Sequence, residues 1–256
     1  MVVTGASTGL GRAIAVEVAS RGAAAVVVNY AHHRAEAEES ASLVRACGTE
    51  AVVVEADVAD DDGCKAIAAA AQRFGRIDAL FNNAGTTRFA SNHADLNAVS
   101  AEDFLRLYQV NVIGAFQMIR ATQTLLEAAE TPAVVNTSSL AGVTGIGSSV
   151  PYSASKGALI TMTIDLARAL APRIRVNAIC PGYIDTPWWE GGIDEAGRER
   201  LRNTVIASTP LQAASTAEDI AGAAVFLASP AARHVTGEIL LVDAGLHLGF
   251  APLVAR

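Results

Sequence analysis

Tyr152 and Lys156 are the residues of this chain whose types and spacing could carry out acid–base chemistry together. Pro151 precedes them, and proline suits the first turn of a helix because its missing N–H has no partner there in any case. The small and apolar residues that follow predict a helix continuing to about Leu170. Residues four apart on a helix share a face, so the phenol and the ammonium would lie side by side. A neighbouring cation stabilises phenolate and lowers the pKa of a tyrosine from about 10 toward neutrality, which suits a general acid.

The same pair has a structural interpretation. A tyrosine and a lysine at this spacing often form an exposed phenol with a lysine stem packed beside it. Upstream, Val134–Val135 predicts a short buried strand, and the Gly- and Ser-rich residues after it predict a loop that begins with Ser138 and Ser139. Whether the pair is catalytic therefore depends on the rest of the chain.

A second candidate site is the glycine-rich segment TGASTGLG at 4–11. Val2–Val3 predicts a strand before it, and Leu10 and Val18 share one face of a helix after it. A strand, a turn and a helix N-terminus in this order direct backbone N–H groups and the helix dipole at a phosphate. The GxxxGxG spacing differs from the usual GxGxxG of dinucleotide-binding folds, and any tight turn could use such glycines. Only three residues precede the motif, so the first strand is unusually short.

The end of the second predicted strand bears on which dinucleotide would bind. Ala24–Val28 is a continuous apolar run, as in a parallel strand buried on both faces. In a dinucleotide fold, a carboxylate after this strand would bind the ribose of NAD and repel the 2′-phosphate of NADP. The chain instead continues NYAHHR at 29–34, with no carboxylate before Glu36. This favours NADP, with Arg34 and a histidine such as His32 near the phosphate; a solvated loop would explain the same residues.

Along the rest of the chain, predicted strands and helices alternate. Further strands are predicted at Ala51–Val54, Ile77–Phe81, Ile174–Ile179 and Glu238–Val242, and helices at about Arg34–Cys47, from Asp60 onward, at Ala101–Gln109, Val112–Ala129 and Ala217–Leu227. Trp188–Trp189 opens a mixed segment that reaches about Pro210. The alternation predicts one α/β domain over 1–256, a doubly wound parallel sheet of about seven strands with helices on both faces.

Composition excludes several classes of protein. No apolar run approaches the roughly 18 residues of a membrane span, and the N-terminus lacks the pattern of a signal peptide, so we expect a cytoplasmic protein. Cys47, Cys64 and Cys180 are widely spaced, against a disulfide framework or a zinc site. The net charge of −7 disfavours nucleic acid as a partner. The acidic triplet at 60–62 lacks calcium-loop spacing and suits a helix N-terminus, so we expect no metal.

Taken together, the motifs resemble those of the classical short-chain dehydrogenase/reductase family, almost from end to end. They are TGASTGLG at 4–11, Asp57-Val58, NNAG at 82–85, Asn111, Ser139 with YSASK at 152–156, PGYIDT at 181–186 and TGEILLVDAG at 236–245. The resemblance implies a Rossmann fold and an NAD(P)-dependent oxidoreductase that acts on a carbonyl or secondary alcohol. It also implies that about 186–212 is a substrate loop or lid.

The resemblance gives four residues catalytic roles. Tyr152 would be the general acid/base, and Ser139, rather than Ser138, would orient the carbonyl oxygen. Lys156 would hold the nicotinamide ribose and lower the pKa of the tyrosine, and Asn111 would anchor a water that links Lys156 to solvent. The cofactor-binding residues implied are Gly5, Ser7, Thr8, Gly9, Leu10 and Gly11 at the pyrophosphate, Asn29, Tyr30, His32 and Arg34 at the ribose, Asp57 and Val58 at the adenine, Asn83, Ala84 and Gly85 beside the adenosine, Tyr152 and Lys156 at the nicotinamide ribose, and Pro181, Gly182, Ile184 and Thr186 near the nicotinamide.

Two features leave the cofactor and the substrate open. Thr8 stands where NADP-preferring relatives often carry a basic residue, so NADP(H) is favoured but NAD(H) remains possible. The segment VVNYAHHRAEAEE is similar to NADPH-dependent 3-oxoacyl-carrier-protein reductases, and Arg173 fits one of their carrier-protein contacts. Glu127 and Glu130 lie where the other contact is basic in those enzymes, which disfavours a carrier-protein substrate.

The aromatic residues Tyr183, Trp188 and Trp189 border the expected substrate entrance and favour a free apolar or aromatic carbonyl compound. Lid packing or a subunit contact would explain the two tryptophans equally well. The resemblance further implies a homotetramer, or a homodimer, with an interface on the helices at about 112–129 and 152–170.

Three alternatives to this enzyme remain. One is an NAD(H)-dependent alcohol, sugar or steroid dehydrogenase of the same family. Another is a non-catalytic, dinucleotide-binding regulatory protein, which loss of Tyr152 or Lys156 would have favoured. A serine hydrolase is disfavoured, because the one GxSxG match, GASTG at 5–9, belongs to the glycine-rich turn already described.

Overall fold

The computed structural model describes residues 1–90 and 92–249, which form one α/β domain around a seven-stranded parallel sheet. The strand order is β3-β2-β1-β4-β5-β6-β7. The strands are β1 Val2–Val3, β2 Ala25–Tyr30, β3 Glu50–Glu55, β4 Ala79–Asn82, β5 Ala133–Thr137, β6 Arg175–Pro181 and β7 Ile239–Val242. The order reverses between β1 and β4, as in doubly wound folds, and confirms the predicted fold class.

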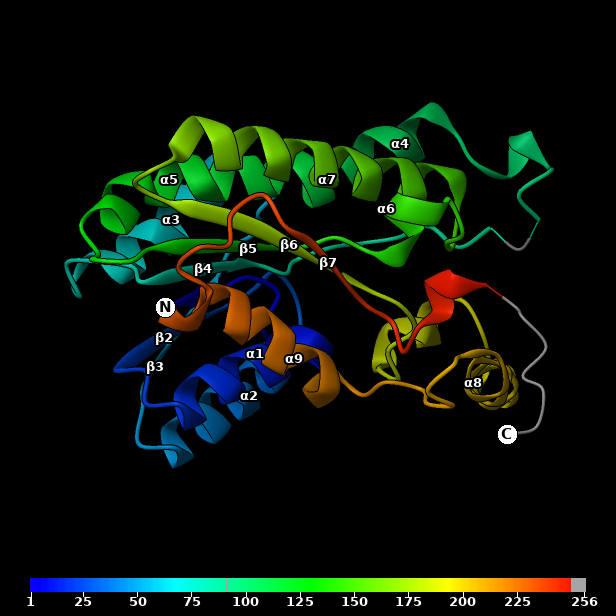
Figure 1. Ribbon diagram of the computed structural model, residues 1–256, viewed down its shortest axis with the longest axis horizontal. Coiled ribbons are helices and arrows are strands. Elements are labelled where there is room, and N and C mark those ends of the chain that lie inside the picture. Colours follow the sequence, from blue (N-terminus) through cyan, green and yellow to red (C-terminus); the bar gives the residue numbers. More distant parts are fainter. Residues whose placement is uncertain (91, 250–256) are drawn as a thin grey trace.

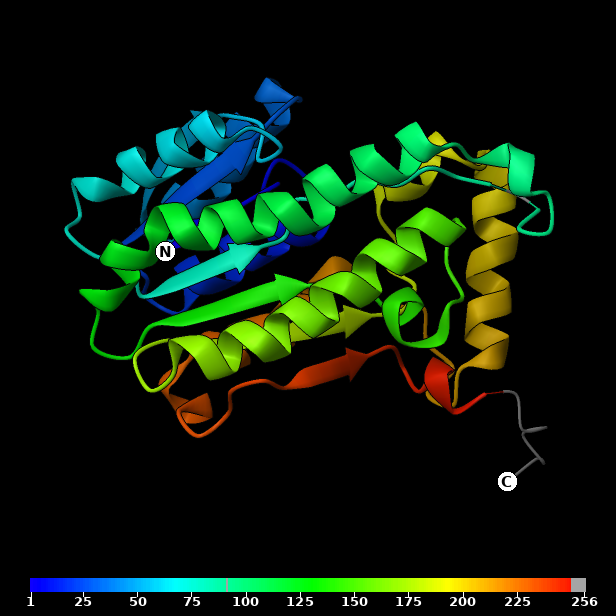
Figure 2. The same cartoon turned by 90° about the horizontal axis from the view of Figure 1, so that it is seen from above.

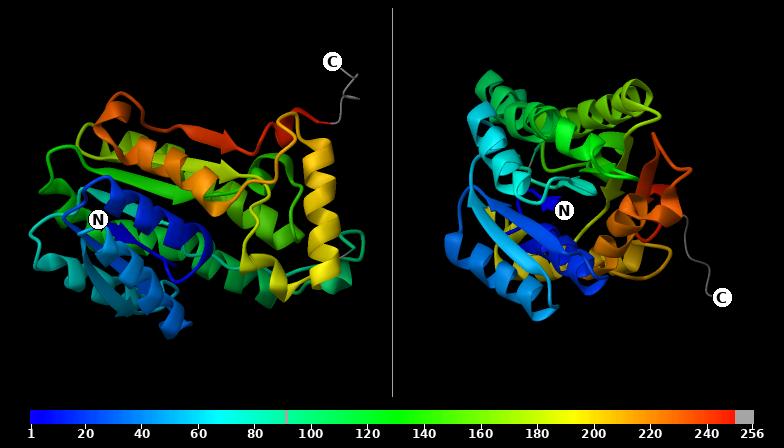
Figure 3. Two further views of the ribbon diagram at one scale, coloured as in Figure 1. Left: turned by 90° about the horizontal axis from the view of Figure 1, so that it is seen from below. Right: turned by 90° about the vertical axis from the view of Figure 1, so that its left-hand side faces the viewer.

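Helices cover both faces of the sheet, as Figure 1 shows from the side and the right-hand view of Figure 3 shows end-on. One face carries α1 Gly9–Ser20, α2 Arg34–Ala46 and α9 Ala217–Ala228. The other carries α3 Asp61–Gln72, α4 Ala101–Tyr108, α5 Ala115–Glu127 and α7 Val150–Leu170. No helix among the described residues is both long and apolar enough to span a membrane.

The sheet forms because its central strands are apolar on both sides. Every residue of β2 and of β4 is buried. Successive side chains of a strand point to opposite faces, and the core divides accordingly. Val28 and Phe81 pack with α1 and α9, whereas Val27 and Leu80 pack with α3, α5 and α7. Burial on both faces explains why these strands have continuous apolar sequences rather than alternating ones.

The carboxyl ends of the strands meet at one edge of the sheet, at the right of Figures 1 and 2. Beyond that edge lie the short helix α6 Leu140–Thr144, the turn η3 Pro187–Gly191 and helix α8 Glu195–Ser208. In Figure 2, α8 crosses the end of the sheet rather than running along a face. The remaining short turns are η1 Leu96–Ala98, η4 Pro230–Ala232 and η5 Leu246–Leu248.

Two helices were not predicted from the sequence. Helix α6 lies inside the Gly- and Ser-rich segment that we expected to be a loop. The Ser139 side chain caps its N-terminus by accepting from the N–H of Ala141, and Gly145 ends it in the left-handed region. Helix α8 lies within the mixed segment and is capped by Asp194, which accepts from the N–H of Gly197. In both places the capping residue sets the helix boundary more strongly than the weak apolar pattern does.

A second departure is the junction between α4 and α5. The sequence predicted a break near Asn111, but the chain continues through a π-helical turn, η2 Gln109–Gly114. Such a turn inserts an extra residue into a helix and often marks a functional site. Gly114 is needed there, because a Cβ would lie 2.9 Å from the carbonyl oxygen of Val58.

The loops after β1 and β4 pack so closely that two glycines are required. A Cβ on Gly5 would lie 2.8 Å from the Cα of Ala84, and φ at Gly5 is +61°. A Cβ on Gly11, in the first turn of α1, would lie 2.1 Å from the carbonyl oxygen of Gly5 and 2.6 Å from the Nδ2 of Asn83. The glycine-rich turn is therefore held against the β4 loop by backbone contact.

Because Gly11 has no room for a methyl group, we expect Gly11→Ala to lower the free energy of unfolding by about 2 kcal/mol or more, the cost of overpacking a tight site. Gly222 in α9 is the matched control, since a Cβ there would meet no atom within 4 Å. Gly222→Ala should raise the free energy of unfolding by about 0.5–1 kcal/mol, because alanine loses less entropy than glycine in a helix. Urea unfolding measures both, and equal effects of the two variants would contradict the packing described.

Candidate active site

The first turn of α7 fixes where Tyr152 and Lys156 lie. Ser149 caps the helix, and its side chain accepts from the N–H of Tyr152 at 3.4 Å. Pro151 stands in the first turn, as the sequence predicted. One turn further on, the Oγ of Ser138 at the end of β5 donates to the backbone carbonyl of Lys156 at 2.8 Å. The helix carrying both residues is thus tied directly to the carboxyl edge of the sheet.

Lys156 is a buried cation, with 4% of its surface exposed. Its Nζ donates to the backbone carbonyl of Thr137 at 2.8 Å. Burial lowers the pKa of Lys156 to about 8, because removing water penalises the charged form. The ammonium also faces Gly85, where an added Cβ would lie 3.5 Å from Nζ.

Tyr152 is half-buried beside this lysine, with the Nζ of Lys156 5.8 Å from the centre of its ring. Burial raises the pKa of Tyr152 to about 12, and a hydrogen bond from the Ser139 hydroxyl opposes the rise. The expectation that Lys156 lowers the pKa of this tyrosine is therefore wrong. Desolvation of the phenolate outweighs the cation, whose Nζ is directed at Thr137 rather than at the phenol oxygen.

Ser139, not Ser138, is the serine that reaches Tyr152. As the cap of α6, the Oγ of Ser139 accepts from the N–H of Ala141 at 3.1 Å, which leaves its own hydrogen free to donate. Ser138 is buried and engaged with Lys156. The structure thus places the phenol, the Ser139 hydroxyl and the ammonium together, in the arrangement that the sequence predicted.

Asn111 lies in the π-helical turn and is buried. Its Oδ1 accepts from the N–H of Thr86 at 2.8 Å, and its Nδ2 donates to the carbonyl of Thr86 and to the Oγ of Ser155, both at 3.0 Å. Its side chain therefore joins α7 to the β4 loop. The water-anchoring role implied by the resemblance stays a prediction.

The glycine-rich turn has the shape of a phosphate site. The carbonyl of Ser7 accepts from the guanidinium of Arg12 at 2.9 and 3.1 Å and from the hydroxyl of Ser40 at 2.9 Å. These bonds hold the turn from behind, and Thr8 and Leu10 lie in the backbone that opens α1. Gly9 has φ +52°, and a Cβ there would meet only Thr186, at 3.6 Å. The turn fits a dinucleotide pyrophosphate, and Thr186 lies opposite it.

Behind the turn, the predicted residues Asn83 and Ala84 have structural contacts that the sequence did not reveal. Thr4, which we did not single out, accepts from the N–H groups of Asn83 and Ala84 at 3.0 Å. The Nδ2 of Asn83 donates to the carbonyls of Thr4 and Gly5. The preceding Asn82 donates to the Oδ1 of Asn136 on the neighbouring strand, so it stabilises the sheet centre.

At the ribose end, the structure divides the predicted residues into two groups. Asn29 is buried, accepts from the N–H of Gly5 at 3.3 Å and donates to the carbonyl of Ala56 at 2.9 Å. Tyr30 is buried and donates to Glu55 at 2.8 Å. The side chains of Asn29 and Tyr30 thus support the fold, and their contact with the ribose stays a prediction. His32 and Arg34 are exposed at the start of α2.

The other predicted cofactor residues line the same edge of the sheet. Asp57 follows β3 and accepts from the N–H of Ala59, and Val58 after it is buried. Pro181 ends β6, and a Cβ on the following Gly182 would lie 2.7 Å from the Cβ of Asp243. Ile184 makes an isolated parallel bridge with Ser215.

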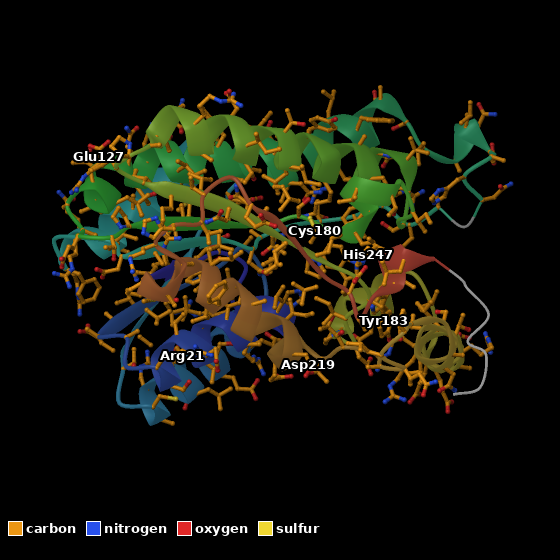
Figure 4. The ribbon with its side chains drawn as sticks, viewed as in Figure 1. Arg21, Glu127, Cys180, Tyr183, Asp219 and His247 are labelled. Carbon is orange, nitrogen blue, oxygen red and sulfur yellow. The ribbon has the colours of Figure 1, made fainter. Side chains whose placement is uncertain are left out.

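Cys180 is a residue of the site that the sequence did not indicate. It is buried at the end of β6, and burial raises the pKa of its thiol, while Ser138, Ser139 and Lys156 act to lower it. Figure 4 shows Cys180 and Tyr183 at this end of the strand. Cys180 is far from Tyr152 along the chain. The two come close only because β6 pairs with β5 in the sheet, so no local sequence pattern points to this cysteine.

Comparison with known proteins agrees with this geometry. Residues 5–247 match the family described as enoyl-(acyl carrier protein) reductase. The chain is 39% identical to a protein of Streptomyces violaceoruber named as ketoacyl reductase 2 of the granaticin polyketide synthase, over 96% of this chain and 95% of that protein. It is 36% identical to an L-rhamnose 1-dehydrogenase (NAD(P)(+)) of a Sphingomonas species, over 97% and 96%.

A solved structure titled as a short-chain dehydrogenase/reductase from Burkholderia xenovorans superposes with a TM-score of 0.87 at 39% identity, covering 97% of each chain. The chain belongs to the short-chain dehydrogenase/reductase family. Membership makes it an NAD(P)-dependent oxidoreductase acting on carbonyl or alcohol substrates.

Proposed function

We propose that this short-chain dehydrogenase/reductase transfers hydride between NADP(H) and a carbonyl or secondary alcohol, with Tyr152 as the general acid/base. The observation that carries the proposal is the grouping of three side chains at the carboxyl edge of the sheet. The Ser139 hydroxyl bonds to the Tyr152 phenol, and the buried Lys156 ammonium lies 5.8 Å from the centre of the phenol ring and faces Gly85. A solvated phenol with a packed lysine stem would need neither a buried ammonium nor a serine aimed at the phenol.

The dinucleotide, when bound, supplies the hydride that the carbonyl carbon receives. Tyr152 then gives the proton that the carbonyl oxygen needs, so that a ketone, one hydride and one proton make one alcohol. A pKa near 12 keeps the phenol protonated at neutral pH, ready to donate. When a carbonyl compound binds, Ser139 would donate to the substrate oxygen the hydrogen that it otherwise shares with Tyr152.

Lys156 would renew that proton and hold the nicotinamide ribose. Below its pKa of about 8 the side chain is charged, and Thr137 accepts only one of its three hydrogens. Gly85 leaves space beside the ammonium, because both Lys156 Nζ and Asn111 Oδ1 lie within 3.5 Å of the place that a Cβ would occupy. A ribose hydroxyl or a water can therefore reach it.

NADP(H) is favoured over NAD(H) by the charge at the start of α2. Arg34 is exposed in the first turn of this helix, between the exposed His32 and the half-buried Glu36. A 2′-phosphate beside Arg34 and the helix N-terminus would be stabilised by both. Glu55, the last residue of β3, is the nearby carboxylate on the neighbouring strand, and it accepts from the Tyr30 hydroxyl.

An NAD(H)-dependent sugar or alcohol dehydrogenase is the second candidate. It is supported by the relative named L-rhamnose 1-dehydrogenase (NAD(P)(+)), whose name gives both dinucleotides. A carrier-protein substrate is disfavoured further. The guanidinium of Arg173 donates to the carbonyls of Glu127 and Ala129, so part of its hydrogen-bonding capacity is used within the chain.

Assembly and location also remain predictions. Ile113, Phe116 and Ile164 are large apolar side chains that stay exposed on η2, α5 and α7. They support a homotetramer, or a homodimer, with its interface on these helices. A cytoplasmic location stays a prediction of the sequence, and so does the lid at about 186–212.

Tyr152→Phe removes the proposed proton donor and leaves the ring in place. We expect kcat for ketone reduction with NADPH to fall by about 10³-fold, within the range for loss of a general acid. The Kd for NADPH, measured by calorimetry, should stay within about threefold because the phenol oxygen is not the main cofactor contact. Near-normal turnover in this variant would remove Tyr152 from the mechanism, and absence of turnover in the unmodified protein would favour a regulatory role.

Arg34→Ala tests the cofactor preference. We expect kcat/KM for NADPH to fall about tenfold, the effect of one charge-assisted hydrogen bond, and kcat/KM for NADH to change less than twofold. Arg45→Ala, in the last turn of the same helix, is the control and should change neither value. A clear preference of the unmodified enzyme for NADH would defeat the NADP assignment.

A further inference from the structure

The two adjacent tryptophans of the segment after β6 have different surroundings. Trp189 is fixed on three sides. Its Nε1 donates to the carbonyl of Ile184 at 2.8 Å, its ring stacks on Tyr183 with centroids 5.3 Å apart, and Phe89 packs against it at 6.1 Å. Trp189 is therefore part of the scaffold, as lid packing would require.

The fixed tryptophan determines where its neighbour lies. Both residues belong to η3, which Pro187 opens and in which successive side chains are about 120° apart. With Trp189 held by Tyr183 and Phe89, Trp188 is turned away from them and toward the active site. Its ring centroid lies 6.1 Å from that of Tyr152, with the planes tilted by 53°.

The support behind Trp189 is itself rigid. A Cβ on Gly192 would lie 2.4 Å from the Phe89 ring, so this ring is pressed directly on the backbone after η3. On the other side, the Tyr183 hydroxyl donates to Asp185 at 3.3 Å, and Arg202 of α8 pairs with the same carboxylate at 3.3 Å. The position of Trp188 is thus set by contacts from three separate segments of the chain.

Trp188 keeps a large free surface although it touches the reacting phenol. It is 37% exposed, and among the described residues its indole nitrogen makes no hydrogen bond. A Cβ on Gly147 would lie 3.2 Å from the phenol ring, and the exposed Ile146 precedes it. Trp188 therefore supplies a large apolar surface beside the phenol.

The distance between the rings limits how a substrate could use this surface. A third ring between Trp188 and Tyr152 would need about 7 Å, twice the optimal separation of stacked carbon atoms. The present 6.1 Å is too small, so a substrate would lie against the free part of the indole while its carbonyl reaches Tyr152 and Ser139. A flat indole surface is complemented best by a flat partner, because aromatic pairs gain more than their buried area alone provides.

We propose that Trp188 is the specificity-determining residue of this enzyme, and that its substrates are ketones or secondary alcohols with an aromatic ring attached to the reacting carbon. The proposal rests on the proposed function, since it concerns what binds beside Tyr152. Trp189, Tyr183 and Phe89 position Trp188 and do not themselves select the substrate.

The first test compares two methyl ketones with eight carbons each, acetophenone and 2-octanone, as substrates with NADPH. We expect the unmodified enzyme to have the higher kcat/KM for acetophenone. Trp188→Ala should lower the acetophenone to 2-octanone ratio of kcat/KM about tenfold, and Trp188→Phe should keep it within about threefold. Phe226→Ala, which removes an exposed aromatic ring from α9, is the control and should leave the ratio unchanged.

A ratio that is the same in Trp188→Ala as in the unmodified enzyme overturns the proposal, and so does a preference of the unmodified enzyme for 2-octanone. These outcomes differ from failure of the proposed function, in which neither ketone is reduced and Tyr152→Phe has no effect.

Binding provides a second readout that does not depend on turnover. The chain contains two tryptophans, so Trp189→Phe leaves Trp188 as the single indole and Trp188→Phe leaves Trp189. Titration of each cofactor-free variant with 1-phenylethanol should give a saturable change in emission for Trp188 and none for Trp189. A saturable change for Trp189 alone, or for neither, would count against Trp188 as the contact with the ring.

Discussion

Burial of one ammonium group is the constraint on which the site depends. Lys156 lies at the carboxyl edge of the sheet with a backbone carbonyl, that of Thr137, as its hydrogen-bond acceptor, and no carboxylate pairs with it among the described residues. A buried charge without an opposite charge is costly, and the lowered pKa is the consequence. The same burial keeps the phenol of Tyr152 protonated. A protonated phenol and an ammonium with a lowered pKa are therefore neighbours in one poorly solvated part of the structure.

The rest of the fold serves to keep that position fixed. Four loops meet there, after β1, β4, β5 and β6, because parallel strands end at the same edge of the sheet. Close contacts join the loops. Gly5 packs against Ala84 with no room for a Cβ, and Asn111 forms hydrogen bonds with both Thr86 and Ser155. The aromatic contacts of Trp189 extend this rigidity to the segment after β6. Short, rigid contacts of this kind hold reacting groups in place at no cost during the reaction.

The sequence predicted the strands, the main helices and the grouping of Tyr152, Lys156 and Ser139, because these depend on local apolar patterns and on motifs with fixed spacing. It did not predict α6 or α8, which depend on the caps Ser139 and Asp194 more than on periodicity. It did not reveal that the side chains of Asn29 and Tyr30 support the fold, since a polar residue at the end of a strand can bind a ligand or support a neighbouring loop. The direction of the Tyr152 pKa was also wrong, because burial of the phenol cannot be judged from spacing along a helix.

The pKa of Lys156 in the cofactor-free protein tests the central claim most directly. The chain has two lysines, Lys65 and Lys156, so lysine labelled with ¹³C at Cε gives two NMR signals, which Lys65→Arg assigns. Lys65 is exposed and paired with Asp61 and Asp62, which raise its pKa above the ordinary lysine value. Our account predicts that the Lys156 signal titrates near pH 8 and the Lys65 signal far above it. Two signals that both titrate at or above the ordinary lysine value would contradict a desolvated ammonium beside Tyr152.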